Sequence, residues 1–140
     1  MTTDSSINRQ TILLTGAGGQ LGQTLQQALS PDKYRVVPIA HAGLDISDEA
    51  AVRRKLDEIR PDAIINAAGY TAVDAAEQDD LTARAANATG PKNLARWAAG
   101  NDAWLLHIST DFVFSGCNSR PYKPDDQTDP LSIYGRTKLE

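Results

Sequence analysis

A glycine-rich segment at residues 15–22 (TGAGGQLG) limits what this chain can fold into more than any other feature. The compact apolar run before it, residues 11–15, is typical of a buried strand. After it, residues 20–29 carry a leucine at every fourth position, as on one face of a helix, and Pro31 follows the end of that helix. Glycines between a strand and a helix permit a tight turn, close approach of a pyrophosphate to the backbone, and packing of helix on strand.

The spacing within this loop favours dinucleotide binding. Gly16, Gly19 and Gly22 form a G-x-x-G-x-x-G pattern, whereas a G-x-G-x-x-G reading that starts at Gly16 fails because residue 21 is Leu21. No Gly-Lys-Ser/Thr follows, so the loop is not that of a nucleotide hydrolase. A helix that begins here directs free N–H groups and a partial positive charge at a phosphate.

The rest of the chain alternates apolar runs with amphipathic stretches. Further strands are predicted at residues 34–40, 63–68 and 103–108, and further helices at residues 48–59, at 81–99 and after Pro130. This alternation predicts an α/β fold, a Rossmann-like doubly wound parallel sheet with crossover helices. The strands lack polar alternation, as expected when helices cover both faces of a sheet.

Four local details qualify these elements. Pro38 suggests that the second strand lies at an edge or contains a bulge, and Ser47 is the expected cap of the helix at 48–59. Propensity alone would break the helix at 81–99 at Gly90-Pro91. Trp104 is expected to pack at a helix-to-strand turn.

Composition narrows the function classes. The 140 residues carry a net charge of −4 with no run of Lys or Arg, which argues against a nucleic-acid or membrane partner. One cysteine excludes a disulfide framework, and no cluster has metal-ligand spacing. We expect a cytoplasmic protein with a polar tail at residues 1–10 and one NAD(P)-binding domain at residues 11–140.

The preferred dinucleotide stays open at this point. An acidic residue at the end of the second strand would hold the ribose of NAD, and an arginine there would favour NADP. That position reads Ala40-His41-Ala42, and Asp45 comes slightly late for the ribose.

A candidate acid–base pair, Tyr134 and Lys138, lies near the end of the chain. The two residues are four positions apart and therefore share one face of a helix. A tyrosine phenol titrates near pH ~10, and a neighbouring ammonium lowers that pKa, so that the phenol can exchange a proton with a carbonyl oxygen. Ser109 and Thr110 follow directly on a strand, at the edge of the sheet where ligands bind. A hydroxyl there can hold the same carbonyl for hydride attack.

Together these motifs resemble the extended short-chain dehydrogenase/reductase family. Within it, residues 11–140 are similar to the N-terminal part of the dTDP-4-dehydrorhamnose reductases. The similar segments are ILLTGAGGQLGQ (12–23), LDISD (44–48), RPDAIINAAGYTAVDAAE (60–77), HISTDFVFSG (107–116) and PLSIYGRTKLE (130–140). The stretch at residues 71–77 is far more specific than the glycine loop.

The resemblance implies an NADPH- or NADH-dependent reduction of the C4 keto group of dTDP-4-dehydro-L-rhamnose, a homodimeric full-length protein, and Mg²⁺ as a further cofactor. The implied catalytic residues are Thr110, Tyr134 and Lys138, with Asp111 beside Thr110 at the sugar. Tyr134 and Lys138 also meet the nicotinamide ribose. The resemblance also implies three further groups of cofactor contacts. They are Gly16, Gly19, Gln20, Leu21 and Gly22 at the pyrophosphate, Asp45 and Ile46 at the adenine, and Gly69, Tyr70 and Thr71 along the middle of the cofactor.

The chain departs from the family pattern in two respects. Phe112 and Ser115 replace the usual Tyr and Asp, and family members are about twice as long, so the chain reads as lacking a C-terminal substrate-binding half. We expect the chain alone to bind nucleotide weakly and to turn over little. Two alternatives stay open: another nucleotide-sugar reductase or epimerase, and a non-catalytic dinucleotide-binding subunit resembling the regulatory subunit of methionine adenosyltransferase.

Overall fold

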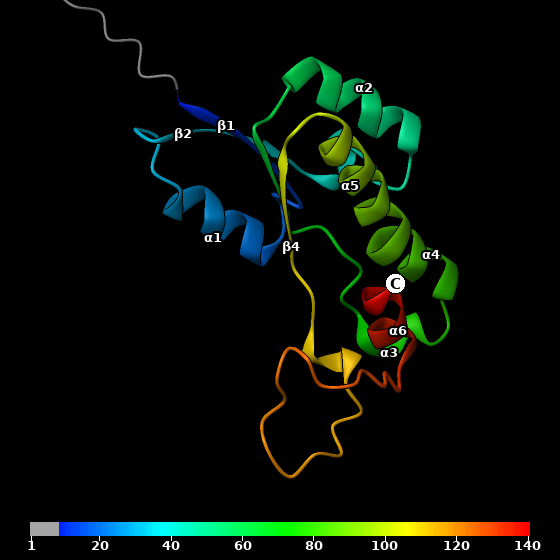
Figure 1. Cartoon of the computed structure of the whole chain (residues 1–140). Coiled ribbons are helices and arrows are strands. Elements are labelled where there is room, and N and C mark those ends of the chain that lie inside the picture. Colours follow the sequence, from blue (N-terminus) through cyan, green and yellow to red (C-terminus); the bar gives the residue numbers. More distant parts are fainter. Residues whose placement is uncertain (1–8) are drawn as a thin grey trace, which may run out of the picture.

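The computed structural model describes residues 9–140, and the predicted tail lies almost wholly outside that range. Four strands form one parallel sheet in the order β2-β1-β3-β4 (Figure 1). They are β1 (Gln10–Thr15), β2 (Tyr34–Ile39), β3 (Ala63–Asn66) and β4 (Trp104–His107). The chain moves from β1 to one side and then returns to the other, so a topological switch point lies between β1 and β3.

Helices cover both faces of the sheet. Figure 1 shows α1 (Gln20–Ala28) on one side, with α2 (Glu49–Ile59) and α5 (Gly90–Gly100) on the other. The predicted doubly wound α/β fold is therefore confirmed. The other elements are η1 (His41–Gly43), α3 (Val73–Ala76), α4 (Asp80–Arg84), η2 (Ala85–Thr89), η3 (Asp111–Val113) and α6 (Ile133–Leu139).

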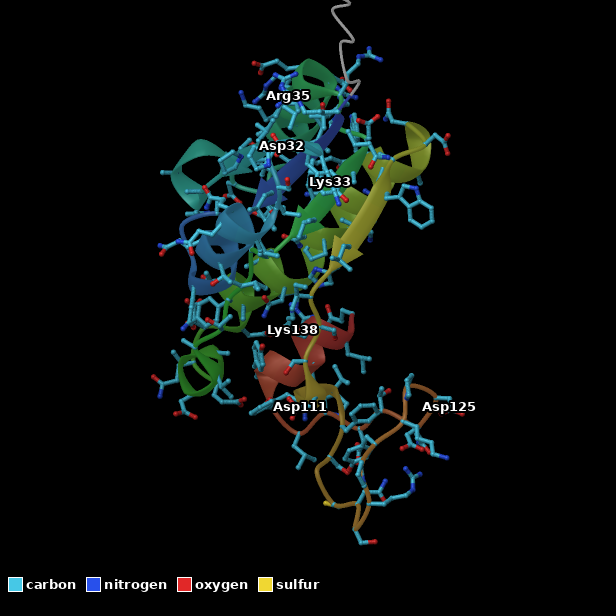
Figure 2. The ribbon with its side chains drawn as sticks, turned by 90° about the vertical axis from the view of Figure 1, so that its left-hand side faces the viewer. Asp32, Lys33, Arg35, Asp111, Asp125 and Lys138 are labelled. Atoms are coloured by element: carbon cyan, nitrogen blue, oxygen red, sulfur yellow. The ribbon has the colours of Figure 1, made fainter. Side chains whose placement is uncertain are left out.

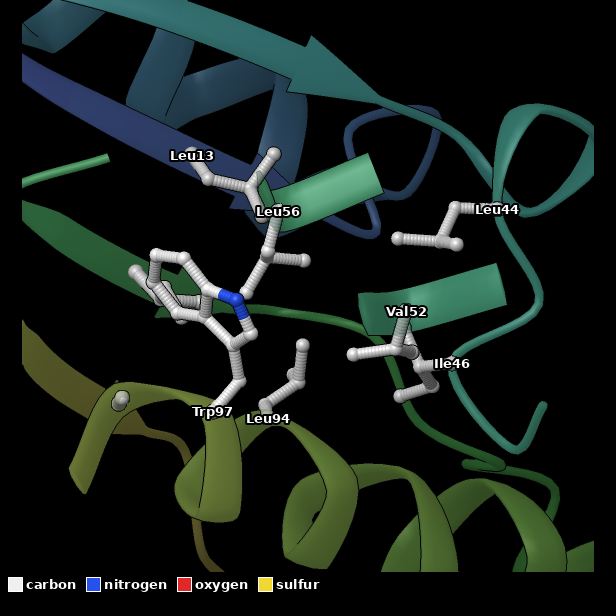
Figure 3. Packing of buried hydrophobic residues seen from close by; sticks show 9 residues of the cluster. Leu13, Leu44, Ile46, Val52, Leu56, Leu94 and Trp97 are labelled. Atoms are coloured by element: carbon white, nitrogen blue, oxygen red, sulfur yellow. The ribbon is translucent and has the colours of Figure 1, made fainter. Parts of the chain in front are cut away.

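The main core lies between the sheet and the pair α2 and α5. Figure 3 shows Val52 and Leu56 of α2 packed toward Leu94 and Trp97 of α5, with Leu13 of β1 beside them. The core also contains Leu44 and Ile46, which anchor the segment between β2 and α2. This burial fixes the polypeptide that follows β2 at the carboxyl edge of the sheet.

The cap of α2 differs from the sequence prediction. Asp48, not Ser47, is the N-cap, and its Oδ1 accepts the N–H of Ala51 at 2.9 Å. Ser47 donates its backbone N–H and its hydroxyl to Asp45 instead. Because Asp and Ser are both good caps, sequence alone placed the boundary one residue early.

The helix does not break at Gly90-Pro91, where propensity alone would end it, but continues through one wide turn. Residues 80–100 form a continuous helical run in which residues 85–89 are a π-helix, closed by the N–H of Gly90 on the carbonyl of Ala85. Pro91 has no N–H and would crowd the carbonyl four residues earlier in a regular helix, so a wider turn accommodates it. Gly90 is needed for packing, since a Cβ there would lie 2.5 Å from the side chain of Ile46.

The two edge strands differ in character. Pro38 lies on the edge strand β2, as predicted. On the other edge strand, Trp104 is 81% exposed and Leu106 is 55% exposed. The prediction that Trp104 packs at the helix-to-strand turn is therefore wrong, because within the described residues no helix covers that face of β4.

Candidate functional site

A cavity of about 830 Å³ opens where β1, β2 and β3 end, at the switch point of the sheet. Ligands of open α/β folds bind at this place. Six of the predicted cofactor residues line it: Gly16, Gly19, Asp45, Ile46, Gly69 and Tyr70. Ala40, His41, Leu81 and Thr82 also face it.

Two glycines let the loop fold tightly beside β3. Gly16 has a φ of +68°, and a Cβ there would lie 2.5 Å from the carbonyl carbon of Ala67. A Cβ on Gly22 would lie 2.7 Å from the Cα of Ala17, so the first turn of α1 can meet the loop only at a glycine. The turn and packing roles expected of the first and third glycines are thus visible in the structure.

The N-terminus of α1 faces the cavity through Gly19, which is its N-cap. No side chain caps this end, and no acidic residue lies in the first turn. Its free N–H groups are therefore available to an anion. Gln20 and Leu21 occupy this first turn and are exposed, and Thr71 is an exposed neighbour of Tyr70.

A row of polar side chains crosses the carboxyl ends of the three strands β1, β3 and β4. Thr15 donates its hydroxyl to Oδ1 of Asn66 at 2.6 Å, and Nδ2 of Asn66 lies 3.0 Å from Nδ1 of His107. Because the same Oδ1 also accepts the N–H of Ala68, the amide nitrogen of Asn66 faces the imidazole. His107 therefore accepts at Nδ1 and is neutral. Burial, and then the nearby charge of Lys138, lower the pKa of His107.

Asn87 joins the cavity to α6. Its side chain is buried, accepts the N–H of Tyr70 at 2.8 Å, and donates to the carbonyl of Tyr70 and to the hydroxyl of Thr137, each at 3.1 Å. Neither Asn87 nor Asn66 was expected from the sequence to have a role in the site. The only sequence signal for either asparagine was a polar residue within an otherwise apolar segment, and that pattern does not show which groups the side chain will hydrogen-bond.

Tyr134 and Lys138 lie on α6, as predicted, and Ser132 caps this helix through the N–H of Gly135. Lys138 is half-buried and donates to the carbonyl of Ile108, just beyond β4. Burial lowers the pKa of Lys138. Lys138 lines a second cavity of about 630 Å³ together with Asn87 and His107.

Thr110 is the N-cap of η3 and lies three residues beyond the end of β4 at His107. Its Oγ1 accepts the N–H of Phe112 at 3.2 Å and donates to Oδ1 of Asp111 at 3.3 Å. The ring of Phe112 meets Tyr134 edge-on, with centroids 5.5 Å apart. Gly135 permits this approach, because a Cβ there would overlap the carbonyl of Phe112. Sequence analysis did not identify Gly135.

All these groups gather at one end of the molecule. Figure 2 shows Asp111 and Lys138 beyond the carboxyl edge of the sheet, with Asp32, Lys33 and Arg35 toward the other end. The predicted catalytic residues do not line the large cavity itself; the loop at Gly69 connects them to it, since a Cβ on Gly69 would lie 3.8 Å from Nζ of Lys138. Across residues 9–140, no group of three or more His, Cys, Asp or Glu is arranged to hold a metal, so the implied Mg²⁺ has no assigned ligands. No helix in the same range is long and apolar enough to span a membrane.

The family model described as RmlD substrate binding domain matches residues 10–140. A dTDP-4-dehydrorhamnose reductase of Mycolicibacterium smegmatis is 47% identical over 93% of this chain and 39% of its own length, and one of Salmonella typhimurium is 40% identical over 91% and 44%. The chain thus spans well under half the length of these curated relatives.

Solved structures agree with the sequence matches. A dTDP-4-dehydrorhamnose reductase of Clostridium acetobutylicum superposes with a TM-score of 0.90 at 43% identity, covering 92% of this chain and 46% of that one. The reductase of Bacillus anthracis, solved in complex with NADP, gives 0.91 at 39% identity, covering 94% and 47%. The chain therefore belongs to the RmlD substrate binding domain family, together with these dTDP-4-dehydrorhamnose reductases.

Proposed function

We propose that this chain is the dinucleotide-binding part of a dTDP-4-dehydrorhamnose reductase, which uses NADPH or NADH to reduce the C4 keto group of dTDP-4-dehydro-L-rhamnose. The observation that carries the proposal is the cavity at the switch point, framed by Gly16 and the uncapped start of α1, with Tyr134 and Lys138 at the same edge of the sheet. Relatives of that name, and one named as a probable 4-ketoreductase of a dTDP-sugar at 43% identity, support the substrate class.

The cavity suits a nicotinamide dinucleotide. Gly16 and Gly22 leave no room for side chains where the loop turns, and the uncapped first turn of α1 after Gly19 would present its free backbone N–H groups to a pyrophosphate. Ile46 and the small residues Ala85 and Ala86 give an apolar wall of the kind that accepts an adenine. When bound, the reduced nicotinamide supplies the hydride for C4.

The chain's own residues would handle the proton. Tyr134 would donate its phenolic proton to the C4 oxygen as negative charge develops there, and the ammonium of Lys138 would stabilise the resulting phenolate. Thr110 would turn its hydroxyl from Asp111 to the same oxygen and orient the carbonyl. The polar row through Asn66 and His107 holds the ends of β3 and β4 in place behind these groups.

Turnover by the 140-residue chain is expected to be low. Lys138 lies in the last turn of α6, which ends at Leu139, and the ends of helices fray. A reacting group displaced by about 1 Å can lose ~10²-fold in rate. The relatives are also longer than this chain, and we expect their additional residues to contact the sugar.

The test is a thermal melt of the purified chain with and without millimolar NADPH or NADH. A ligand that binds only the folded state raises the midpoint, so either cofactor should raise it. A cooperative melt that neither cofactor shifts would refute the dinucleotide site. Overnight incubation with NADPH and the keto sugar, analysed by mass spectrometry, should give at most traces of reduced sugar, and Tyr134→Phe should remove them. Rapid complete reduction would contradict the expectation of a loosely held site.

The same proposal extends to the whole protein. A homodimeric full-length parent and a cytoplasmic location accord with a biosynthetic reductase acting on a nucleotide sugar. Sedimentation of the full-length parent would test the first, and fractionation of its source cells the second.

A further inference from the structure

The rim of the large cavity beside β2 is where a cofactor's adenosine ribose would lie. The carbonyl of Ile39 at the end of β2 accepts the N–H of Ala17 at 3.2 Å, which places this strand end against the glycine loop. Ala40 follows, and a Cβ on Gly18 would be in contact with it at 3.6 Å. The next residue, His41, starts η1 and is exposed on the cavity wall.

The charges on this wall are few. A carboxylate at the end of β2 would accept the ribose hydroxyls of NAD and repel a 2′-phosphate, but this position is Ala40. The titratable side chains that line the cavity are His41, Asp45 and Tyr70. Among them only His41 can carry a positive charge.

Asp45 is the negative neighbour of His41, and its carboxylate is already engaged. Oδ1 accepts the backbone N–H of Ser47 at 2.9 Å and its hydroxyl at 2.7 Å. These hydrogen bonds, and more weakly the charge of His41, lower the pKa of Asp45. Burial of Leu44 and Ile46 on either side fixes this carboxylate in place (Figure 3).

Cations also face His41 from the other side. A hollow of about 510 Å³ between η1 and α2 is lined by His41 and Asp45 together with Arg54, Lys55 and Glu58 of α2. Lys55 pairs with Glu58 at 2.9 Å, whereas Arg54 has no ion pair among residues 9–140. The charged groups around His41 are therefore two carboxylates, both engaged by hydrogen bonds, and two cations. Of the two cations, only Lys55 is paired with a carboxylate among residues 9–140.

We propose that His41 binds the adenosine 2′-phosphate of NADPH in its protonated form, so that pH sets the preference of this chain for NADPH over NADH. The inference rests on the proposed dinucleotide site. NADH has a hydroxyl at the same place, which gains little from a cation. Since proton and cofactor binding are linked, NADPH must raise the titration midpoint of His41 by the amount that protonation strengthens NADPH binding.

Proton NMR tests this directly because the chain contains only two histidines, His41 and His107. Their ring resonances would be titrated from pH 5.5 to 8.5 in the free chain and in chain saturated with NADPH or NADH. NADPH should raise the His41 midpoint by about one pH unit and NADH should not, since a phosphate beside a partly exposed cation acts at about this scale. His107 lies at the opposite end of the site beside Lys138, so its midpoint should not differ between the two cofactors.

Affinity should follow the same linkage. By linkage, a one-unit rise in the His41 midpoint corresponds to a gain of up to about tenfold in NADPH affinity relative to NADH as the pH is lowered. Above pH 6.5 most of the phosphate is doubly charged, because its second pKa is ~6. Phosphorus NMR of the bound cofactor would follow that ionisation separately.

Paired variants separate the proposal from a general charge effect. His41→Gln should remove the pH dependence of the NADPH preference, while Arg35→Gln, an exposed cation toward the opposite end of the sheet (Figure 2), should leave it intact. Equal midpoints of His41 with both cofactors, or a pH-dependent preference that survives His41→Gln, would overturn the role of His41 while leaving the dinucleotide site standing. Failure of both cofactors to bind would refute the site and this inference with it.

Discussion

The substitution Gly135→Ala tests whether close contact between α6 and η3 builds the candidate catalytic site. An added Cβ would overlap the carbonyl oxygen of Phe112, and would lie 3.0 Å from its carbonyl carbon and 3.1 Å from Cβ of Pro130. Optimal carbon–carbon contacts lie at ~3.5–4.0 Å, so α6 must move by about 0.5–1 Å. The nearer neighbour is backbone, which cannot rotate away as a flexible side chain could.

Two effects of opposite sign set the magnitude. Overpacking of this kind costs about 1–3 kcal/mol, and replacing glycine by alanine within a helix returns up to about 1 kcal/mol. We expect a net loss of about 1–2 kcal/mol, which for a chain of this length lowers the midpoint of thermal unfolding by roughly 3–8 °C. Hydrogen exchange of the α6 amides should also accelerate, since α6 can move away from η3 while the sheet stays folded.

The matched control is Gly100→Ala at the end of α5. A Cβ on Gly100 would meet nothing within 4 Å, so this variant should be neutral or slightly more stable than the parent. If Gly135→Ala were as stable as Gly100→Ala, with unchanged exchange in α6, the contact between α6 and η3 would not restrain Tyr134, and the reasoning would be wrong.

Three further outcomes are expected. Asn87→Ala should lower the free energy of unfolding in urea by about 2–4 kcal/mol, because it leaves both polar groups of Tyr70 without their partner inside the protein; Asn101→Ala, which removes one hydrogen bond to Trp97, should cost far less. The free energy of unfolding should fall as the pH drops below about 6.5, because the pKa of His107 is lower in the folded protein and the unfolded chain therefore takes up a proton first. His107→Gln should flatten this slope in urea titrations from pH 5 to 7.5. Trp104→Glu should change the thermal midpoint little and reduce self-association in sedimentation experiments, since this side chain is 81% exposed; a large fall in the midpoint would show that Trp104 is packed.

The fold was predictable from sequence because its determinants are local. The apolar runs of β1 and β3, the leucine spacing of α1 and the glycines of the loop each specify an element without knowledge of its partners. Their alternation then leaves little choice but a parallel sheet. The exposed face of β4 could not be predicted in this way, because an apolar strand reads the same whether or not a helix covers it.

The candidate site was predictable only in part. Glycine spacing identified the loop, and the i, i+4 pair placed Tyr134 and Lys138 on one helix. Apart from the N–H of Ala68, the hydrogen-bond partners of the Asn66 and Asn87 carboxamides lie 17 to 51 positions away, and no local pattern encodes such partners. The need for glycine at residue 135 could not be predicted for the same reason, since it comes from the carbonyl of Phe112 on another element.

These long-range contacts explain why the wide turn in the helix at residues 80–100 matters to the site. The turn spans residues 85–89 and contains Asn87, whose side chain holds the Tyr70 loop on one side and Thr137 of α6 on the other. A regular α-helix has 3.6 residues per turn, so removing the extra residue would rotate Asn87 by roughly 100° relative to the residues before it. Pro91 disfavours the regular form from four residues away. The proline that sequence rules read as a helix breaker thus helps to keep Asn87 between the cofactor cavity and the helix that carries Tyr134.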